Sequence, residues 1–385
     1  MNNNKKVILG IENKEAYLDL LKGKRVGLIT NPTGINSSFE SSIDILLNNK
    51  CNLVALYSPE HGVRGSLQAG VQVDSYIDEI TGINVISLYG KNKRPGKEIM
   101  DQIDFMCIDI QDSGSRYYTF IYTMAYAMMA CADFDKDFVV FDRPNPINGA
   151  IVEGNHLNVD KYRSFVGYYD IPQRHGMTIG ELASLFNKEF GINCKLHVIP
   201  MIGWEREMSF EDTNLPWVVP TPNLPTVNTA WLYNCTCIFE GTNISEGRGT
   251  TTPFEIIGAP YIKSEVLSKE LNDYKLPGVY FRPQWFTPTF SKYKDELCGG
   301  VYVHITNRNT FQACKTSFII LKHIRENYPE FMINKPYVEG RPTLFHLEAG
   351  TDEFINNELS IEEICNKIDE ASCEFIELRK KYLLY

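Results

Sequence analysis

Four loops of the chain combine acidic side chains with arginine, and each follows a short apolar segment. They cover residues 58–65, 111–119, 142–146 and 240–251. Turn formation explains the glycines and prolines of such loops, but not the repeated pairing of carboxylates with guanidinium groups. Carboxylates in a cleft can act as general acid, general base, nucleophile or metal ligand. Guanidinium groups bind carboxylate or phosphate through paired hydrogen bonds. The pattern predicts an enzyme that acts on an anionic substrate.

Glu60 and His61 form the most specific pair in these loops. Glu60 follows Pro59, which restricts the backbone at the end of a predicted strand. Burial there would raise the pKa of the carboxyl and keep a fraction of it protonated near neutral pH. Such a group suits a general acid that protonates a leaving oxygen, with His61 tuning it or binding substrate. The alternative is that Glu60 only accepts hydrogen bonds from loop amides.

The other loop residues have competing structural and functional interpretations. For Arg64, Arg116 and Arg248 we favour ligand binding, whereas Arg143 beside Asp142 suggests bracing of a proline-rich loop. His175 either faces the cleft or closes its loop. The stiff segment 220–225 (PTPNLP) can present an asparagine, Asn223, to a sugar hydroxyl or amide.

Composition and motifs exclude several classes of function. The chain has 385 residues, 43% of them hydrophobic, and a net charge of −10 without any basic run. An extended nucleic-acid surface is therefore not expected, because phosphate binding needs a basic footprint. No GxGxxG follows the first predicted strand and no GxxxxGK[ST] occurs, which argues against a dinucleotide or P-loop nucleotide site. The ten cysteines lie mostly in or beside apolar runs, as expected for buried thiols.

No segment predicts export or membrane insertion. The apolar stretch from Val7 is too short for a signal-peptide core, and no run is long enough to cross a bilayer. We therefore expect a cytoplasmic protein without a membrane partner.

The predicted elements indicate an α/β fold. Strands are predicted at 25–30, 53–57, 84–89, 105–110, 138–141, 196–199 and 237–239, and helices at 39–47, 117–132 and 178–190. Strands that are apolar on both faces and alternate with helices form mostly parallel sheets covered on both sides. Ligands bind such sheets beyond the carboxyl ends of the strands, where the four loops lie.

The pattern of predicted elements changes near residue 260. A polar helix is predicted at 264–273, an alternating strand at 300–306, and amphipathic helices at 311–328 and 361–384. We predict a catalytic domain over 1–260 and a smaller α+β domain over 261–385 that closes the cleft.

From about residue 22 to residue 350 the chain resembles the NamZ-type exo-β-N-acetylmuramidases, a glycoside hydrolase family long described as a domain of unknown function. Several motifs in one order make the resemblance specific. They are 23–34 (GKRVGLITNPTG), 58–62 (SPEHG), 109–119 (DIQDSGSRYYT), 142–146 (DRPNP), 174–177 (RHGM), 220–223 (PTPN), 239–243 (FEGTN) and 245–249 (SEGRG).

The resemblance implies a fold, a reaction and a substrate. It implies a Rossmann-like N-terminal domain, a smaller C-terminal domain and a cleft between them. The implied reaction releases terminal N-acetylmuramic acid from the non-reducing end of peptidoglycan fragments, in cell-wall turnover or recycling, without cofactor or metal. The lactyl carboxylate of that sugar would account for the arginines. Without an export signal, the substrate would be an imported disaccharide or muropeptide rather than intact wall.

In this hypothesis Glu60 is the general acid/base, and a second group stabilises or attacks the oxocarbenium-like centre. Asp112 is the first candidate and Glu246 the second, while the 2-acetamido group of the substrate could itself be the nucleophile. The residues expected to bind substrate are His61, Arg64, Asp109, Arg116, Tyr118, His175, Asn223, Glu240, Asn243 and Arg248.

Two other functions remain open from the sequence. One is a metal-dependent hydrolase of a phosphate or amide, with Glu60, His61, Asp109 and Asp112 as ligands. The other is a non-catalytic saccharide-binding protein.

Overall fold

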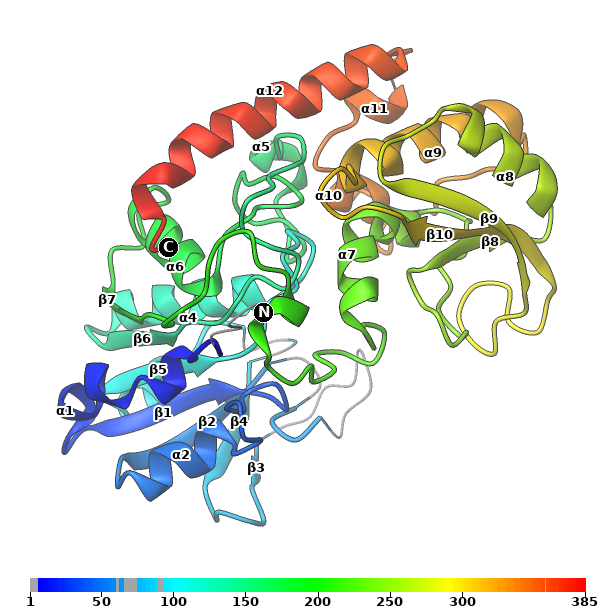
Figure 1. Cartoon of the computed structure of the whole chain (residues 1–385). Coiled ribbons are helices and arrows are strands. Elements are labelled where there is room, and N and C mark those ends of the chain that lie inside the picture. The colour runs from blue at the N-terminus through cyan, green and yellow to red at the C-terminus, as the bar shows by residue number, and fades with distance from the viewer. Residues whose placement is uncertain (1–5, 60–61, 66–74, 89, 91–92, 357) are drawn as a thin grey trace, which may run out of the picture.

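The computed structural model describes residues 6–59, 62–65, 75–88, 90, 93–356 and 358–385. These residues form a larger lobe around a seven-stranded sheet and a smaller lobe around a three-stranded sheet (Figure 1). The predicted fold class is therefore confirmed.

The large sheet has the strand order β3-β4-β2-β1-β5-β6-β7 and is parallel except for the β3–β4 pair. The order reverses at β1, which lies between β2 and β5, and ligands bind beside such a switch point in open α/β sheets. The strands are β1 (Arg25–Thr30), β2 (Asn52–Ser58), β3 (Tyr76–Ile77), β4 (Asn84–Ser87), β5 (Phe105–Asp109), β6 (Asp137–Phe141) and β7 (Lys195–Ile199).

Helices cover both faces of this sheet, because its strands present apolar side chains to each side. Val26 and Leu28 of β1 pack in one core with Ile43 of α2, whereas Ile29 packs in the other core with residues of α4 and α6. A capping box formed by Thr178 and Glu181 starts α6. The helical elements of this lobe are η1 (Gly10–Glu12), η2 (Lys14–Ala16), α1 (Leu18–Leu21), α2 (Ser42–Asn48), α3 (Lys97–Met100), α4 (Phe120–Asp133), α5 (Val159–Tyr162), α6 (Ile179–Lys188) and η4 (Phe210–Thr213).

The smaller lobe is built on the antiparallel sheet β8-β10-β9. Its strands are β8 (Ile256–Ala259), β9 (Val279–Phe286) and β10 (Cys298–Ile305), and its helical elements are α7 (Val227–Thr236), η5 (Cys237–Gly241), α8 (Ser264–Asp273), α9 (Ala313–Asn327), α10 (Leu344–Ala349) and α11 (Glu353–Asn356). β8 lies before residue 260. The domain boundary that we predict between residues 260 and 261 stays a prediction.

The strand predicted at 237–239 is wrong. These three residues form the 3-10 helix η5, which continues directly from α7. All three side chains are buried, and a short apolar run buried on every side looks the same in sequence whether it is strand or helix.

Helix α12 (Ile361–Arg379) spans both lobes (Figure 1). Ile364 and Ile368 pack in the core of the smaller lobe, and Phe375 packs in the core of the larger one. After η6 (Lys380–Tyr382), the Tyr385 hydroxyl donates to Asp142 Oδ2 at 2.8 Å. In the part of the chain that the structure describes, no helix combines the length and apolar character needed to cross a membrane.

Candidate active site

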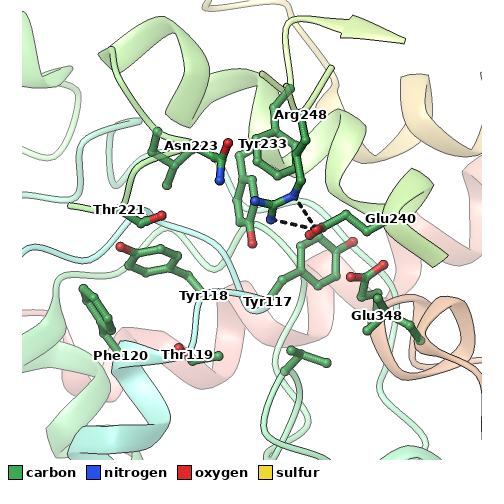
Figure 2. A pocket seen from close by; sticks show the side chains of 14 residues that line it. Tyr117, Tyr118, Thr119, Phe120, Thr221, Asn223, Tyr233, Glu240, Arg248 and Glu348 are labelled. Carbon is green, nitrogen blue, oxygen red and sulfur yellow. Dashed lines mark hydrogen bonds and ion pairs between the residues drawn. The ribbon is translucent and has the colours of Figure 1, made fainter. Parts of the chain in front are cut away.

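A pocket lies between the lobes, at the end of the large sheet where β5 leads into α4 (Figure 2). The larger lobe supplies residues 117–120 and Val166. The smaller lobe supplies Glu240 from η5, Arg248 from the following loop and Glu348 from α10. The other lining residues are Thr221, Asn223, Leu224, Tyr233, Phe254 and Leu344. Most of the wall is aromatic or aliphatic, and its charged groups gather on the side of the smaller lobe.

Arg248 and Lys292 neutralise two carboxylates at this side of the pocket. Arg248 Nη2 lies 2.7 Å from Glu240 Oε1, and its Nε lies 3.3 Å from Glu246 Oε1. Lys292 Nζ lies 2.8 Å from Glu246 Oε2. Burial alone would lower the pKa of Arg248, but the two carboxylates outweigh it and raise that pKa. Arg248 is therefore a fixed cation.

Glu348 differs from these carboxylates because it has no cation as a direct partner among the residues that the structure describes. It is 2% exposed, and Cys237 Sγ lies 3.8 Å from its Oε1 atom and 3.5 Å from Glu240 Oε2, so the single S–H is shared between the two carboxyls. The other oxygen, Oε2, is buried and makes no hydrogen bond to any described group. Burial, and then the negative charge of Glu240, raise the pKa of Glu348 well above its usual range. Burial raises the pKa of Glu240 as well, but Arg248 lies 2.7 Å from that carboxylate and lowers its pKa. The pair therefore favours the proton on Glu348 and the negative charge on Glu240.

Cys237, Glu240 and Glu348 have the donor types of a metal site, and their nearest donor atoms lie within 4.8 Å of one another. Burial, however, raises the pKa of the Cys237 thiol well above its ordinary value. A cation would have to displace protons from both Cys237 and Glu348 while facing Arg248. The cluster suits a hydrogen-bonding acid better than a metal.

Two contacts bring Glu240 and Glu348 together. Gly241 packs directly against α10, and a Cβ atom at this position would lie 2.3 Å from the backbone nitrogen of Phe345. Arg116, which is fully buried, donates to the backbone oxygen of Glu348 at 2.7 Å and to that of Ala349 at 3.2 Å. The larger lobe thus holds the end of α10 in place.

Some of the predicted site residues line this pocket, namely Tyr118, Asn223, Glu240 and Arg248. Glu246 lies behind Arg248, where two cations neutralise it. Glu60 and His61 lie outside the described residues, so their roles stay predictions.

Two predicted carboxylates are tied to the protein itself. Asp109 accepts hydrogen bonds from Arg143 and Ser42, so that Arg143 braces Asp109 rather than its neighbour Asp142. Asp112 Oδ2 accepts from the backbone nitrogen of Gly114 at 2.7 Å and lies 3.3 Å from His175 Nε2. Neither lines the pocket between the lobes.

The remaining predicted residues also contact protein groups. Arg116 donates only to backbone oxygens in the described chain, including that of Ile171 at 3.0 Å. Arg64 pairs with Asp78 at 3.0 Å. Asn243 accepts from the backbone nitrogen of Met332 at 2.9 Å, within the smaller lobe. His175 is completely buried in its loop.

Sequence reasoning missed Tyr117, Tyr233 and Glu348 as lining residues. Glu348 had one signal, because it is the single carboxylate in the apolar segment 344–349 (LFHLEA), just before Gly350. Nothing in the sequence connects it with Cys237, which lies 111 residues earlier.

The chain matches two family models that together cover most of its length. The model described as exo-β-N-acetylmuramidase NamZ, N-terminal, matches residues 26–228, and the C-terminal model matches residues 231–385. A peptidoglycan β-N-acetylmuramidase NamZ of Bacillus subtilis (strain 168) is 52% identical over 373 residues, which are 96% of this chain and 89% of that protein.

Two solved structures of DUF1343 family proteins from Bacteroides fragilis NCTC 9343 share the fold. One has a TM-score of 0.90 at 38% identity and the other 0.80 at 33%, and each comparison covers 99% of both chains. Because each comparison covers both lobes, these structures share the two-lobed fold of this chain. The chain belongs to the NamZ family of exo-β-N-acetylmuramidases.

Proposed function

We propose that the chain is an exo-acting glycoside hydrolase that releases terminal N-acetylmuramic acid from the non-reducing end of peptidoglycan fragments. Its substrate is a saccharide that carries a lactyl carboxylate. The family and the named activity of the Bacillus subtilis relative support this proposal.

The observation that carries the proposal is Glu240, which pairs with Arg248 at the wall of an aromatic pocket. Tyr117, Tyr118 and Tyr233 offer ring surfaces against which the apolar face of a sugar can pack (Figure 2). A carboxylate at such a wall can stabilise the positive charge that develops on a sugar as its glycosidic bond breaks.

These contacts change the order of our candidates for the second catalytic group. Asp112 does not line the pocket, and its Oδ2 atom accepts from the backbone nitrogen of Gly114, whereas Glu246 is neutralised by Arg248 and Lys292. Glu240 lines the pocket and keeps 20% of its side chain exposed. We therefore place Glu240 first as the group that stabilises the oxocarbenium-like centre, and Glu60 keeps the proposed role of general acid/base.

The reaction is tested with disaccharides of defined sequence. Free N-acetylmuramic acid should appear from a fragment that carries this sugar at its non-reducing end. None should appear when N-acetylglucosamine occupies that end. Release from both fragments would contradict the exo specificity, and release from neither would contradict the activity.

The role of Glu60 is tested by Glu60→Gln with a chromogenic N-acetylmuramide. We expect kcat to fall at least about a hundredfold, because acid–base groups contribute that much or more. Glu79→Gln is the matched control, since Glu79 is exposed and its loss removes one charge from the same part of the chain. Retention of more than about a tenth of wild-type activity in Glu60→Gln would exclude it as the acid.

A further inference from the structure

Glu348 has a feature that the proposed reaction does not yet use. Glu348 lines the pocket, and its Oε2 atom is buried and without a hydrogen-bond partner among the residues described. A buried polar atom left unpaired is costly, and native proteins rarely keep one without a reason. Its carboxyl lies beside Glu240, next to the space that the aromatic residues enclose (Figure 2).

The groups that face Glu348 determine what its carboxyl can do. Arg248 and Lys292 are paired with Glu240 and Glu246, and no other described cation is a direct partner of Glu348. Their attraction for an ionised Glu348 is outweighed by its burial and by the charge of Glu240. Its thiol and phenol neighbours also stay protonated, since burial raises their pKa values. The titratable groups that influence it are Tyr117, Tyr233, Cys237, Glu240, Glu246, Arg248, Lys292 and Tyr337.

The balance of charges around Glu348 also limits which substrate groups can bind beside its carboxyl. A substrate carboxylate placed beside Glu348 would add a buried negative charge, and no described cation there is free to pair with it. Such a charge is strongly unfavourable. A hydroxyl or an amide carbonyl has no such penalty and accepts a hydrogen bond from a neutral acid.

We infer that Glu348 is a specificity residue that donates a hydrogen bond from its neutral carboxyl to an uncharged oxygen of the bound sugar. This inference rests on the proposed function. It adds Glu348 to the residues that bind the sugar and makes the protein the donor of that hydrogen bond. The acceptor is a hydroxyl or the acetamido carbonyl, and the lactyl carboxylate lies elsewhere in the pocket.

The test compares Glu348→Gln with Glu348→Leu. Glutamine keeps a donor of nearly the same shape, whereas leucine keeps the volume and removes the donor. The dissociation constant for N-acetylmuramic acid is measured by calorimetry, together with kcat and KM on the chromogenic N-acetylmuramide. Glu339→Gln, at an exposed position, is the charge-matched control, and thermal unfolding shows whether each variant is folded.

We expect Glu348→Gln to bind the sugar within about threefold of wild type, and Glu348→Leu to bind it about tenfold or more weakly, chiefly through KM. As pH rises, the wild-type carboxyl ionises and stops donating, so its affinity for the sugar should fall. Glu348→Gln should not show that alkaline loss.

Two results would overturn the inference. A collapse of kcat in Glu348→Gln with unchanged sugar binding would mean that Glu348 transfers a proton. Wild-type binding in both folded variants would mean that Glu348 does not contact the sugar. Binding is measured without turnover, so a wild-type protein that binds the sugar but does not hydrolyse the glycoside contradicts only the proposed function.

Discussion

Replacing Arg116 tests whether this residue binds substrate, as the sequence indicates, or holds the fold together, as its contacts indicate. The sequence predicts that Arg116 binds substrate. In the fold, its guanidinium group is completely buried and donates to the backbone oxygens of Asn155, Ile171, Glu348 and Ala349. Arg116→Met keeps much of the aliphatic volume and removes every one of these donors.

The expected magnitude follows from the two shortest of these hydrogen bonds, 2.7 Å to Glu348 O and 3.0 Å to Ile171 O. A hydrogen bond from a charged donor contributes about 1.5–3 kcal/mol, and the cost of burying the guanidinium group offsets part of the total. We therefore expect the free energy of unfolding to fall by about 3 kcal/mol. If the chain unfolds as one unit, Tm falls by about 4 °C, from an unfolding entropy of about 2 cal/mol/K per residue.

Calorimetric unfolding measures this loss, and Arg163→Met, at an exposed position of the same lobe, is the control. Affinity for N-acetylmuramic acid should fall as well, because α10 would no longer be held at Glu348. An unchanged Tm combined with loss of sugar binding would refute the structural role and restore Arg116 as a ligand-binding residue.

Two further variants test the close approach of η5 to α10 and the burial of Asp142. Gly241→Ala should lower the free energy of unfolding by about 1–3 kcal/mol and weaken sugar binding, because its Cβ would lie 2.3 Å from Phe345 N. Gly96→Ala is the control, since a Cβ there would have no atom within 4 Å. Equal changes of Tm in the two variants would contradict the argument. Burial raises the pKa of Asp142 from 3.8 to about 7. Between these pH values the folded state therefore binds more protons than the unfolded state. The free energy of unfolding of the wild type should fall by up to about 4 kcal/mol as pH rises through that window. Asp142→Asn should remove this slope, and parallel pH–stability curves for the two proteins would exclude Asp142 as its source.

The fold was largely predictable because its signals are local. β1 and β5 are short apolar segments that end at polar loops, and α8 has the bounds that its polar helical pattern indicated. The region around residue 238 was not predictable in this way, since its burial depends on α7 and the core of the smaller lobe rather than on its own pattern.

The site was only partly predictable because it is assembled from distant segments. Glu240 and Arg248 follow one another in a charged loop, and the sequence placed both in the site. Glu348 joins them through Gly241, whose missing side chain permits an approach that no periodicity reveals. Conversely, Asp112 and Arg116 have the composition of a ligand-binding loop, but both side chains are buried there. Asp112 Oδ2 accepts from the backbone of Gly114, and Arg116 donates to backbone oxygens.

The path of α12 has a consequence for the order in which the chain folds. Tyr385 contacts Asp142 across a separation of 243 residues, and the Ser372 hydroxyl accepts from the backbone nitrogen of Gly154 across 218. During synthesis the larger lobe therefore emerges from the ribosome long before the helix that covers it, and Phe375 is absent from its core until then. Until α12 arrives, the larger lobe exposes the apolar surface that Phe375 later covers. Because α12 contributes side chains to both cores, the cores of the two lobes are completed together, when this last helix packs.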